Sequence, residues 1–450
     1  MKDLTQGSIP RHILVMAIPI GISMLIQTLY YLVDLYFVGH LGPASLAGVS
    51  AAGNVSFLVI ALTQVLGVGT QTLIAHAVGR KDRDDANWVF NQSLLLSALL
   101  GLITLAAGYG LSGWYLHTVS SDPATIREGL TYLYWYTPAM AGQFALIAMG
   151  SALRGTGIVM PTMVIQLITT VLNMVLSPML IQGWWFAAPM GVAGAGLAST
   201  ISVWVAVILL AWYFSRMEKY VEYAASKVRP RLSVWRRMLG IGLPAGGEFM
   251  LMFLYMAVIY FAISELGAVA QAGFGLGSRI MQSMFLPAMA VAFAAPAVAG
   301  QNFGARLFDR VRATFHWAAG MSLGIMALLT WVAYAQPMWL VQSFADDAQA
   351  LVVASTFLHM ICLNFMASGL IFTCSGMFQA LGHTWPAMWS TATRLVTFAI
   401  PAIWLSRQAD FRIEQLWVAS VITVYLQLVV SWWLLQRQFR RSLSPDAAAV

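Results

Sequence analysis

Residues 13–38 read ILVMAIPIGISMLIQTLYYLVDLYFV, and a single carboxylate, Asp34, interrupts an otherwise aliphatic and aromatic run. No other charged residue occurs between Arg11 and Arg80. The run exceeds the ~20 apolar residues that a helix needs to cross the hydrocarbon core of a bilayer. It is too long for the hydrophobic part of a signal peptide, and no small-residue cleavage site follows it. The stretch therefore predicts a retained membrane-spanning helix with an acid inside it.

The composition of the whole chain extends this interpretation. The 450 residues are 60% hydrophobic and 9% charged, whereas a soluble domain carries about 25% charged residues. Such a chain cannot cover a soluble surface, so we expect an all-α integral membrane protein. The two cysteines, Cys362 and Cys374, are too far apart on one predicted helix to pair. No Cys/His cluster with metal-ligand spacing occurs, so we expect no metal site.

Twelve segments of the chain are long and apolar enough to span a bilayer. They cover residues 13–38, 46–75, 88–112, 128–149, 160–181, 191–214, 238–262, 269–299, 313–335, 350–374, 385–405 and 414–435.

The distribution of basic residues supports twelve spans with a cytoplasmic N-terminus. In that topology only Arg127, Arg407 and Arg412 of the 24 basic residues fall outside the cell, and Arg279 and Arg394 fall inside spans. The remaining basic residues all fall on the cytoplasmic side, as the positive-inside rule requires. The net charge of +7 thus indicates membrane orientation, and we expect no nucleic-acid partner. We predict a monomeric, multi-pass protein of a bacterial-type inner or plasma membrane, with both termini cytoplasmic.

An internal repeat divides the chain into halves. When the sequence is aligned with itself so that Pro19 meets Pro244, glycines and prolines at predicted helix entries and turns coincide in one ungapped register. The further pairs include Gly21 and Gly246, Gly42 and Gly267, Gly157 and Gly382, and Pro161 and Pro386. We predict an N-lobe of six spans (1–214), a cytoplasmic linker (215–237) and a C-lobe of six spans (238–450). An even number of spans per half implies parallel repeats related by a pseudo-twofold axis along the membrane normal, an arrangement used by transporters.

Four sequence stretches carry a family resemblance: residues 18–49 (IPIGISMLIQTLYYLVDLYFVGHLGPASLAGV), 151–163 (SALRGTGIVMPTM), 277–305 (GSRIMQSMFLPAMAVAFAAPAVAGQNFGA) and 378–388 (FQALGHTWPAM). In this order, and with twelve spans, they resemble the multidrug and toxic compound extrusion (MATE) family. The resemblance implies a secondary transporter, and Asp34 matches the first-helix aspartate that the family uses to bind its coupling ion.

The fifth span decides which branch of that family is nearest. Members of the DinF-like branch have an Asn-x-x-x-Asp-Pro pattern there, and this chain has Asn173 but Ser177 in place of the acid. The acids that the NorM-like branch carries in helices 7 and 10 do not match here, because helix 10 has none and Glu248 lies about one turn early. The resemblance therefore places the chain nearer the DinF-like branch. A single carboxylate favours protons over sodium as the coupling ion and leaves sodium open.

Intramembrane polar residues supply the candidate sites, because a charge in the bilayer is costly and functional by default. For ion coupling we group Asp34 with Tyr30, Gln27, Asn173, Ser177, Ser199 and Thr200. The alternative for Asp34 is a structural acid that is hydrogen-bonded to Asn173 or to a tyrosine. A second ion or substrate site is predicted from Glu248, Tyr31 and Tyr255; the alternative for Glu248 is an ion pair with Arg279 or Arg394. Those two arginines are predicted to act structurally, as anchors for carbonyl or carboxylate groups.

Three function classes remain from the sequence. The first is an antiporter that exports organic cations or amphipathic compounds in exchange for protons or sodium through Asp34, without a cofactor. The second is a flippase of the same superfamily that moves a lipid-linked precursor, for which few intramembrane arginines are available. The third is an intramembrane enzyme, for which neither a nucleophile–base pair nor a metal set is apparent. A phosphate-binding loop of the form G-x-x-x-x-G-K-[ST] is absent, so ATP is not expected to drive transport.

Overall fold

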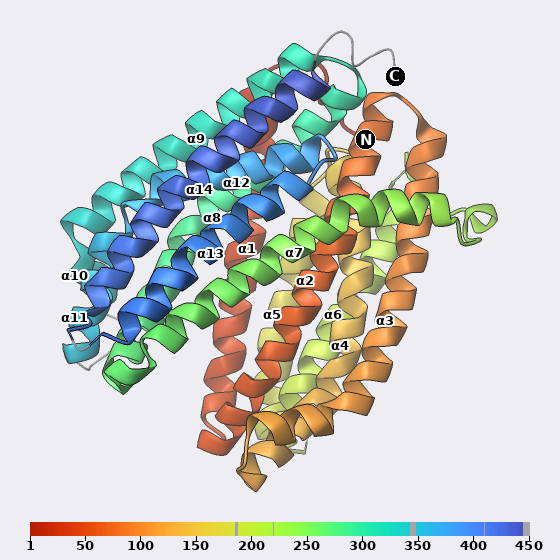
Figure 1. Cartoon of the computed structure of the whole chain (residues 1–450). Helices are drawn as coiled ribbons and strands as arrows, with labels where there is room; N and C mark the ends of the chain where they lie inside the picture. Colours follow the sequence, from red (N-terminus) through yellow and green to blue (C-terminus); the bar gives the residue numbers. More distant parts are fainter. Residues whose placement is uncertain (185–187, 219, 343–347, 409, 444–450) are drawn as a thin grey trace. The chain divides into compact units, whose positions relative to one another are not determined.

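The protein is helical throughout the residues that the computed structural model describes, which are 1–184, 188–218, 220–342, 348–408 and 410–443 (Figure 1). In the first half the helices are α1 (Ile9–Gly39), α2 (Pro43–Gly79), α3 (Arg83–Val119), α4 (Pro123–Gly155), α5 (Met160–Gln182) and α6 (Val192–Arg216), followed by the short η1 (Ala225–Lys227). The second half contains α7 (Leu232–Ala262), η2 (Ser264–Leu266), α8 (Ala268–Gly304), α9 (Phe308–Ala335), α10 (Pro337–Val341), α11 (Ala348–Ile361), α12 (Asn364–Ala380), α13 (Trp385–Ser406) and α14 (Ile413–Ser442). Lys219 of the predicted linker and residues 444–450 of the predicted C-lobe lie outside the described residues.

All twelve predicted spans coincide with helices. Within the described ranges nine helices are long and apolar enough to cross a membrane, and the bent pair α11–α12 forms a tenth such span. The other two predicted spans correspond to α4 and α13. These two helices are less hydropathic because they are rich in Tyr, Trp and Thr. The prediction of an all-α, twelve-span membrane protein is confirmed.

The backbone repeats in the predicted register, which pairs Pro19 with Pro244. In that register the bounds of α2 coincide with those of α8, and the bounds of α4 coincide with the start of α11 and the end of α12. Gly42 and Gly267 both have positive φ, as do Gly157 and Gly382. Among the described residues, the two non-glycine residues with positive φ, Lys81 and Arg306, are also repeat partners. Left-handed backbone is uncommon for residues other than glycine, so its recurrence in register is specific evidence for duplication.

The chain forms two compact units, and neither is a simple half of the sequence. The first unit comprises residues 1–3 and 22–246, and the second comprises residues 4–21 and 247–450. The predicted division at residues 214 and 238 follows the order of the chain, whereas these units follow contacts. Helices α1 and α7 therefore each contribute one part to each unit.

The points at which α1 and α7 change units are equivalent in the repeat. Helix α1 changes units after Gly21 and α7 changes after Gly246, and each glycine lies two residues after a proline inside the helix, Pro19 or Pro244. A proline in a helix interior removes one backbone hydrogen bond and favours a kink. The sequence thus weakens both helices where they pass from one unit to the other.

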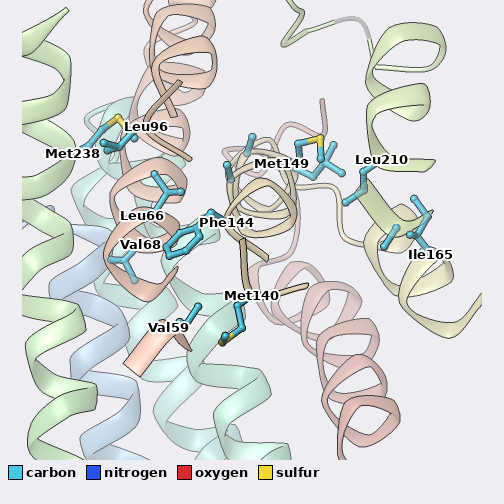
Figure 2. Packing of buried hydrophobic residues seen from close by; sticks show 14 of the residues in the cluster. Val59, Leu66, Val68, Leu96, Met140, Phe144, Met149, Ile165, Leu210 and Met238 are labelled. Carbon is cyan, nitrogen blue, oxygen red and sulfur yellow. The ribbon is translucent and has the colours of Figure 1, made fainter. Parts of the chain in front are cut away.

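Large apolar side chains fill the core of the first unit. Figure 2 shows Phe144 of α4 pointing toward α2, which carries Leu66 and Val68, and all three residues are buried. Helices α7 and α2 also approach each other closely in this core. Gly242 of α7 allows this approach, because a Cβ atom at that position would clash with the carbonyl oxygen of Val65 in α2. Small residues that allow backbones to approach are typical of helix interfaces within membranes.

The break between α11 and α12 is one place where the two repeats differ. The two helices meet at an angle of 60° around Leu363, whereas the equivalent position in the uninterrupted α4 is Pro138. A break frees backbone carbonyl groups that lipid cannot satisfy. Here the hydroxyl of Thr330 donates to the carbonyl oxygen of Cys362 at 3.1 Å. The kink is thus stabilised by a side chain of the neighbouring α9.

The glycine contact between α7 and α2 predicts opposite effects for two neighbouring substitutions. Gly242→Ala is expected to destabilise the protein by about 1–3 kcal/mol, because the added methyl group overpacks the interface with Val65. Gly240→Ala, two residues earlier, has nothing within 4 Å of its added Cβ and is expected to stabilise the helix by about 0.5–1 kcal/mol. Thermal unfolding in detergent measures both. Equal melting temperatures for the two variants would contradict this account of the interface.

Candidate functional site

Asp34 lies in the part of α1 that belongs to the first unit. Its side chain is 7% exposed, and the buried Val38 lies one turn further along the same face. A shallow apolar depression of about 430 Å³ is lined by residues such as Leu32, Leu35 and Tyr36. Those residues lie on the other side of α1, and Asp34 does not line the depression. Asp34 is therefore an intramembrane acid that points into its own helical unit.

Ser177 of α5 contacts Asp34, and Ser177 also contacts Asn173 of the same helix. Ser177 and Asn173 are one turn apart and fully buried. The Ser177 hydroxyl lies 3.5 Å from Oδ1 of Asp34 and 3.2 Å from Oδ1 of Asn173, so its one hydrogen can be donated to only one of them at a time. The side-chain nitrogen of Asn173 has no hydrogen-bond partner. The side-chain oxygens of Asp34, Asn173 and Ser177 thus lie close together, and the Ser177 hydroxyl is the one donor among these three atoms.

Tyr30 and Ser199 continue the polar cluster toward α6. The Tyr30 hydroxyl and the Ser199 Oγ are 2.6 Å apart. Thr200 has a different role, because its hydroxyl donates to the backbone carbonyl of Trp135 at 2.5 Å and joins α6 to α4. The side chains of Gln27 and Tyr31 are exposed, and the structure describes no contact between either of them and Asp34. Of the predicted ion-coupling set, Asp34, Asn173 and Ser177 lie together, and Tyr30 with Ser199 flanks them.

Two tyrosines of α4 that we did not single out from the sequence also belong here. Tyr132 and Tyr136 stack with ring centroids 5.0 Å apart, and both interact electrostatically with Asp34. Tyr136 is additionally hydrogen-bonded to Ser56 of α2. Their i, i+4 spacing in TYLYWY was the available signal, since that spacing places two side chains on one helix face.

Glu248 occupies a different kind of environment in the second unit. It is 5% exposed, and its Oε2 accepts a hydrogen bond from Ser375 of α12 at 2.8 Å. Thr391 of α13 also hydrogen-bonds to it, and Thr391 in turn accepts from Nε2 of Gln427 at 3.2 Å. Among the described residues Glu248 forms no ion pair with Arg279 or Arg394. Hydroxyl groups, rather than an arginine, satisfy this acid.

The remaining predicted residues of the second unit lie on either side of this network. Tyr255, two turns after Glu248 in α7, has its hydroxyl 2.8 Å from Ser420 Oγ. The guanidinium of Arg394 lies over the Tyr255 ring, 4.1 Å from its centroid. Arg279 of α8 is exposed.

The structure defines a class of protein: a polytopic helical membrane protein built from a duplicated unit, with buried acids in its spans. The MatE family model matches residues 19–179 and 244–405. The two matched segments begin at the repeat partners Pro19 and Pro244, and together they cover most of the chain. The chain belongs to the MatE family, so it is a transporter and not an enzyme.

Individual relatives agree with this assignment. The probable multidrug resistance protein YoeA of Bacillus subtilis is 24% identical over 95% of this chain and 94% of its own length. A protein named FAD transporter from Shewanella oneidensis is 24% identical over 97% of both chains. A solved structure, described as the outward-facing conformation of a multidrug resistance MATE family transporter, superposes with a TM-score of 0.91, 24% identity and 98% coverage of both chains. At that identity the structural likeness establishes the shared twelve-helix fold.

Adjacent tyrosines of α1 offer a matched test of the cluster around Asp34. Tyr30→Phe is expected to destabilise the protein by about 1 kcal/mol, because the fully buried Ser199 loses its partner. Tyr31→Phe removes a hydroxyl from a side chain that is 59% exposed and is expected to change stability by less than about 0.5 kcal/mol. Thermal unfolding in detergent compares the two. A Tyr30→Phe variant as stable as Tyr31→Phe would show that the bond to Ser199 contributes nothing.

Proposed function

We propose that this protein is a secondary antiporter that exports organic cations or other amphipathic compounds in exchange for protons. The observation that carries the proposal is the environment of Asp34. It is a buried carboxylate whose described hydrogen-bond partner is one hydroxyl at 3.5 Å, and no basic side chain of the described residues pairs with it. An ionised carboxylate in this position requires a cation.

A proton and a cationic substrate would exclude each other at Asp34, and this exclusion would couple the entry of one to the export of the other. When a proton binds, Asp34 becomes neutral and needs little from its neighbours. When the proton leaves, the negative charge favours a cationic substrate or a change in α1 that brings donors closer. Since Pro19 and Gly21 weaken α1 where it changes units, the charge state of Asp34 can bias two conformations of that helix. The same group cannot hold both ligands at once, which is the requirement for antiport.

The direction of transport follows from the predicted topology. We place the protein in an inner or plasma membrane of bacterial type, as a monomer with both termini cytoplasmic and nearer the DinF-like branch. Asp34 then lies near the outer end of α1, within reach of external protons. The name of YoeA favours drug-like cargo, and that of the FAD transporter indicates that relatives carry quite different molecules. Glu248, with Tyr255 near it, is the second candidate for a proton or a cationic group.

Replacing the acid tests the coupling. Asp34→Asn is expected to lower proton-driven export of ethidium from inverted vesicles at least tenfold, because the amide cannot bind and release a proton. Glu265→Gln removes an exposed acid of η2 and is the control, expected to export at the wild-type rate. Undiminished export by Asp34→Asn would refute the assignment of coupling to this residue.

Restoring the missing acid of α5 tests the choice of ion. Ser177→Asp would place a second carboxylate beside Asp34 and Oδ1 of Asn173, and hard cations prefer oxygen ligands of this kind. We expect a sodium gradient to drive export by this variant at least tenfold better than by wild type. Ser177→Asn, similar in size but uncharged, is the control. Equal sodium responses in the two variants would mean that this cluster does not select the ion.

A further inference from the structure

A dense group of positive charges lies where the chain enters α7. The stretch 227–237 contains Lys227, Arg229, Arg231, Arg236 and Arg237, and no acid occurs between Glu222 and Glu248. Helix α7 is one of the helices long and apolar enough to span a membrane. A cluster of roughly four to eight basic residues directly beside a spanning helix is typical of segments that bind anionic lipids.

Two of these five charges are neutralised within the protein. Lys227 and Arg237 each form an ion pair with an acid in the first turn of α3. The ion pairs of the described residues include none of the other three, which are Arg229, Arg231 and Arg236. All three are exposed. These three arginines are therefore the charges that remain available to an outside partner.

A buried glutamine of α3 holds the segment before α7 in place. Nε2 of Gln92 donates to the carbonyl oxygens of Lys227 and Arg229 at 2.7 and 2.8 Å. Its Oε1 accepts from the backbone N–H of Arg231 at 2.9 Å, and Gln92 itself is 0% exposed. The guanidinium of Arg231 lies over the ring of Trp88, 4.4 Å from its centroid. Arg229 and Arg231 thus project from a backbone that is preorganised for binding.

Arg236 lies on a face of α7 that is exposed along its length. Leu232 precedes it by four residues and Leu243 follows it by seven, a spacing that places all three on one helix face. Leu232 is 74% exposed and Leu243 is 56% exposed. Leu243 lies ~10 Å further along the axis, since the helix rises ~1.5 Å per residue. In a spanning helix this face meets acyl chains at Leu243 and headgroups at Arg236.

The start of α7 is also unfavourable for so many cations. The N-terminus of a helix carries a partial positive charge, which favours nearby anions and disfavours nearby cations. Helix α7 has no acid in its first turn, and Arg229, Arg231 and Arg236 surround that end. A phosphate group placed there would interact favourably with the helix end and with the guanidinium groups.

We propose that residues 228–236 form a docking surface for an anionic phospholipid of the cytoplasmic leaflet. Arg229, Arg231 and Arg236 bind the headgroup, and Val228 and Leu232, which are 48% and 74% exposed, lie against the first carbons of the acyl chains. The proposal uses the topology in which the start of α7 is cytoplasmic. It is independent of the ion and the cargo that the protein transports, so failure of the proposed export leaves it standing.

Native mass spectrometry of the whole protein in a neutral detergent measures lipid binding directly. The probes are phosphatidylglycerol and phosphatidylcholine with identical acyl chains. Glycerol phosphate, which has the phosphate without the chains, is added as a competitor. The site variant combines Arg229→Gln, Arg231→Gln and Arg236→Gln. The control variant removes the same charge from exposed arginines of the second unit, by combining Arg312→Gln, Arg440→Gln and Arg441→Gln.

Wild type is expected to bind phosphatidylglycerol about tenfold or more tightly than phosphatidylcholine, because each arginine beside an anionic headgroup adds to the affinity. The site variant is expected to lose this preference, and the control variant to keep wild-type affinity for phosphatidylglycerol within about twofold. Added salt is expected to weaken phosphatidylglycerol binding to wild type more than to the site variant, since exposed charges are screened. Glycerol phosphate at the concentration of the lipid is expected not to displace it.

Four results would overturn the inference. Wild-type protein that binds the two phospholipids equally is the first, and this comparison requires no variant to fold. A site variant with wild-type affinity for phosphatidylglycerol would place the lipid elsewhere. A control variant that loses as much affinity as the site variant would attribute binding to net charge alone. Displacement of the lipid by an equal concentration of glycerol phosphate would identify a site for small anions instead of a lipid surface.

Discussion

Hydrocarbon cannot form hydrogen bonds, so every backbone amide and polar side chain within the spans must find its partner inside the protein. This constraint explains why the described chain is helical and why its one sharp break, at Leu363, is covered by Thr330. It also gives meaning to the few groups that remain unsatisfied. A guanidinium nitrogen without an acceptor, such as Nε of Arg394, would be hydrated at the surface of a soluble protein, but it cannot be hydrated by hydrocarbon.

Duplication provided the scaffold, and later divergence placed the charges. The turns, helix bounds and unit crossings recur in the register that pairs Pro19 with Pro244, but the intramembrane charges do not. The repeat partners of Asp34, Glu248, Arg279 and Arg394 are Ile259, Ser23, Asn54 and Thr169. The backbone geometry is thus common to both halves, whereas each half has its own set of intramembrane charges.

The sequence predicted the fold better than it predicted the sites, for a physical reason. Spans and turns depend on hydropathy and on glycine and proline, which are local properties, so the twelve spans and the repeat could be read directly. The meeting of Asp34 with Asn173 and Ser177 came from family resemblance, since residues of α1 and α5 are far apart in sequence. The electrostatic interaction of Tyr132 and Tyr136 with Asp34 and the hydrogen bond of Thr391 with Glu248 depend on how helices rotate about their axes. Hydropathy does not determine that rotation to within one side chain. The points at which α1 and α7 pass from one unit to the other, Gly21 and Gly246, likewise depend on contacts between helices and not on the order of the chain.

The two buried acids differ in a way that separates their roles. Glu248 accepts hydrogen bonds from Ser375 and Thr391, so its ionised form has two hydroxyl donors. Asp34 has one donor at 3.5 Å, so a proton or cation changes its energy substantially. A ligand shifts a conformational equilibrium only by the difference in its interaction with the two states. The less satisfied acid is therefore better suited to drive a conformational change.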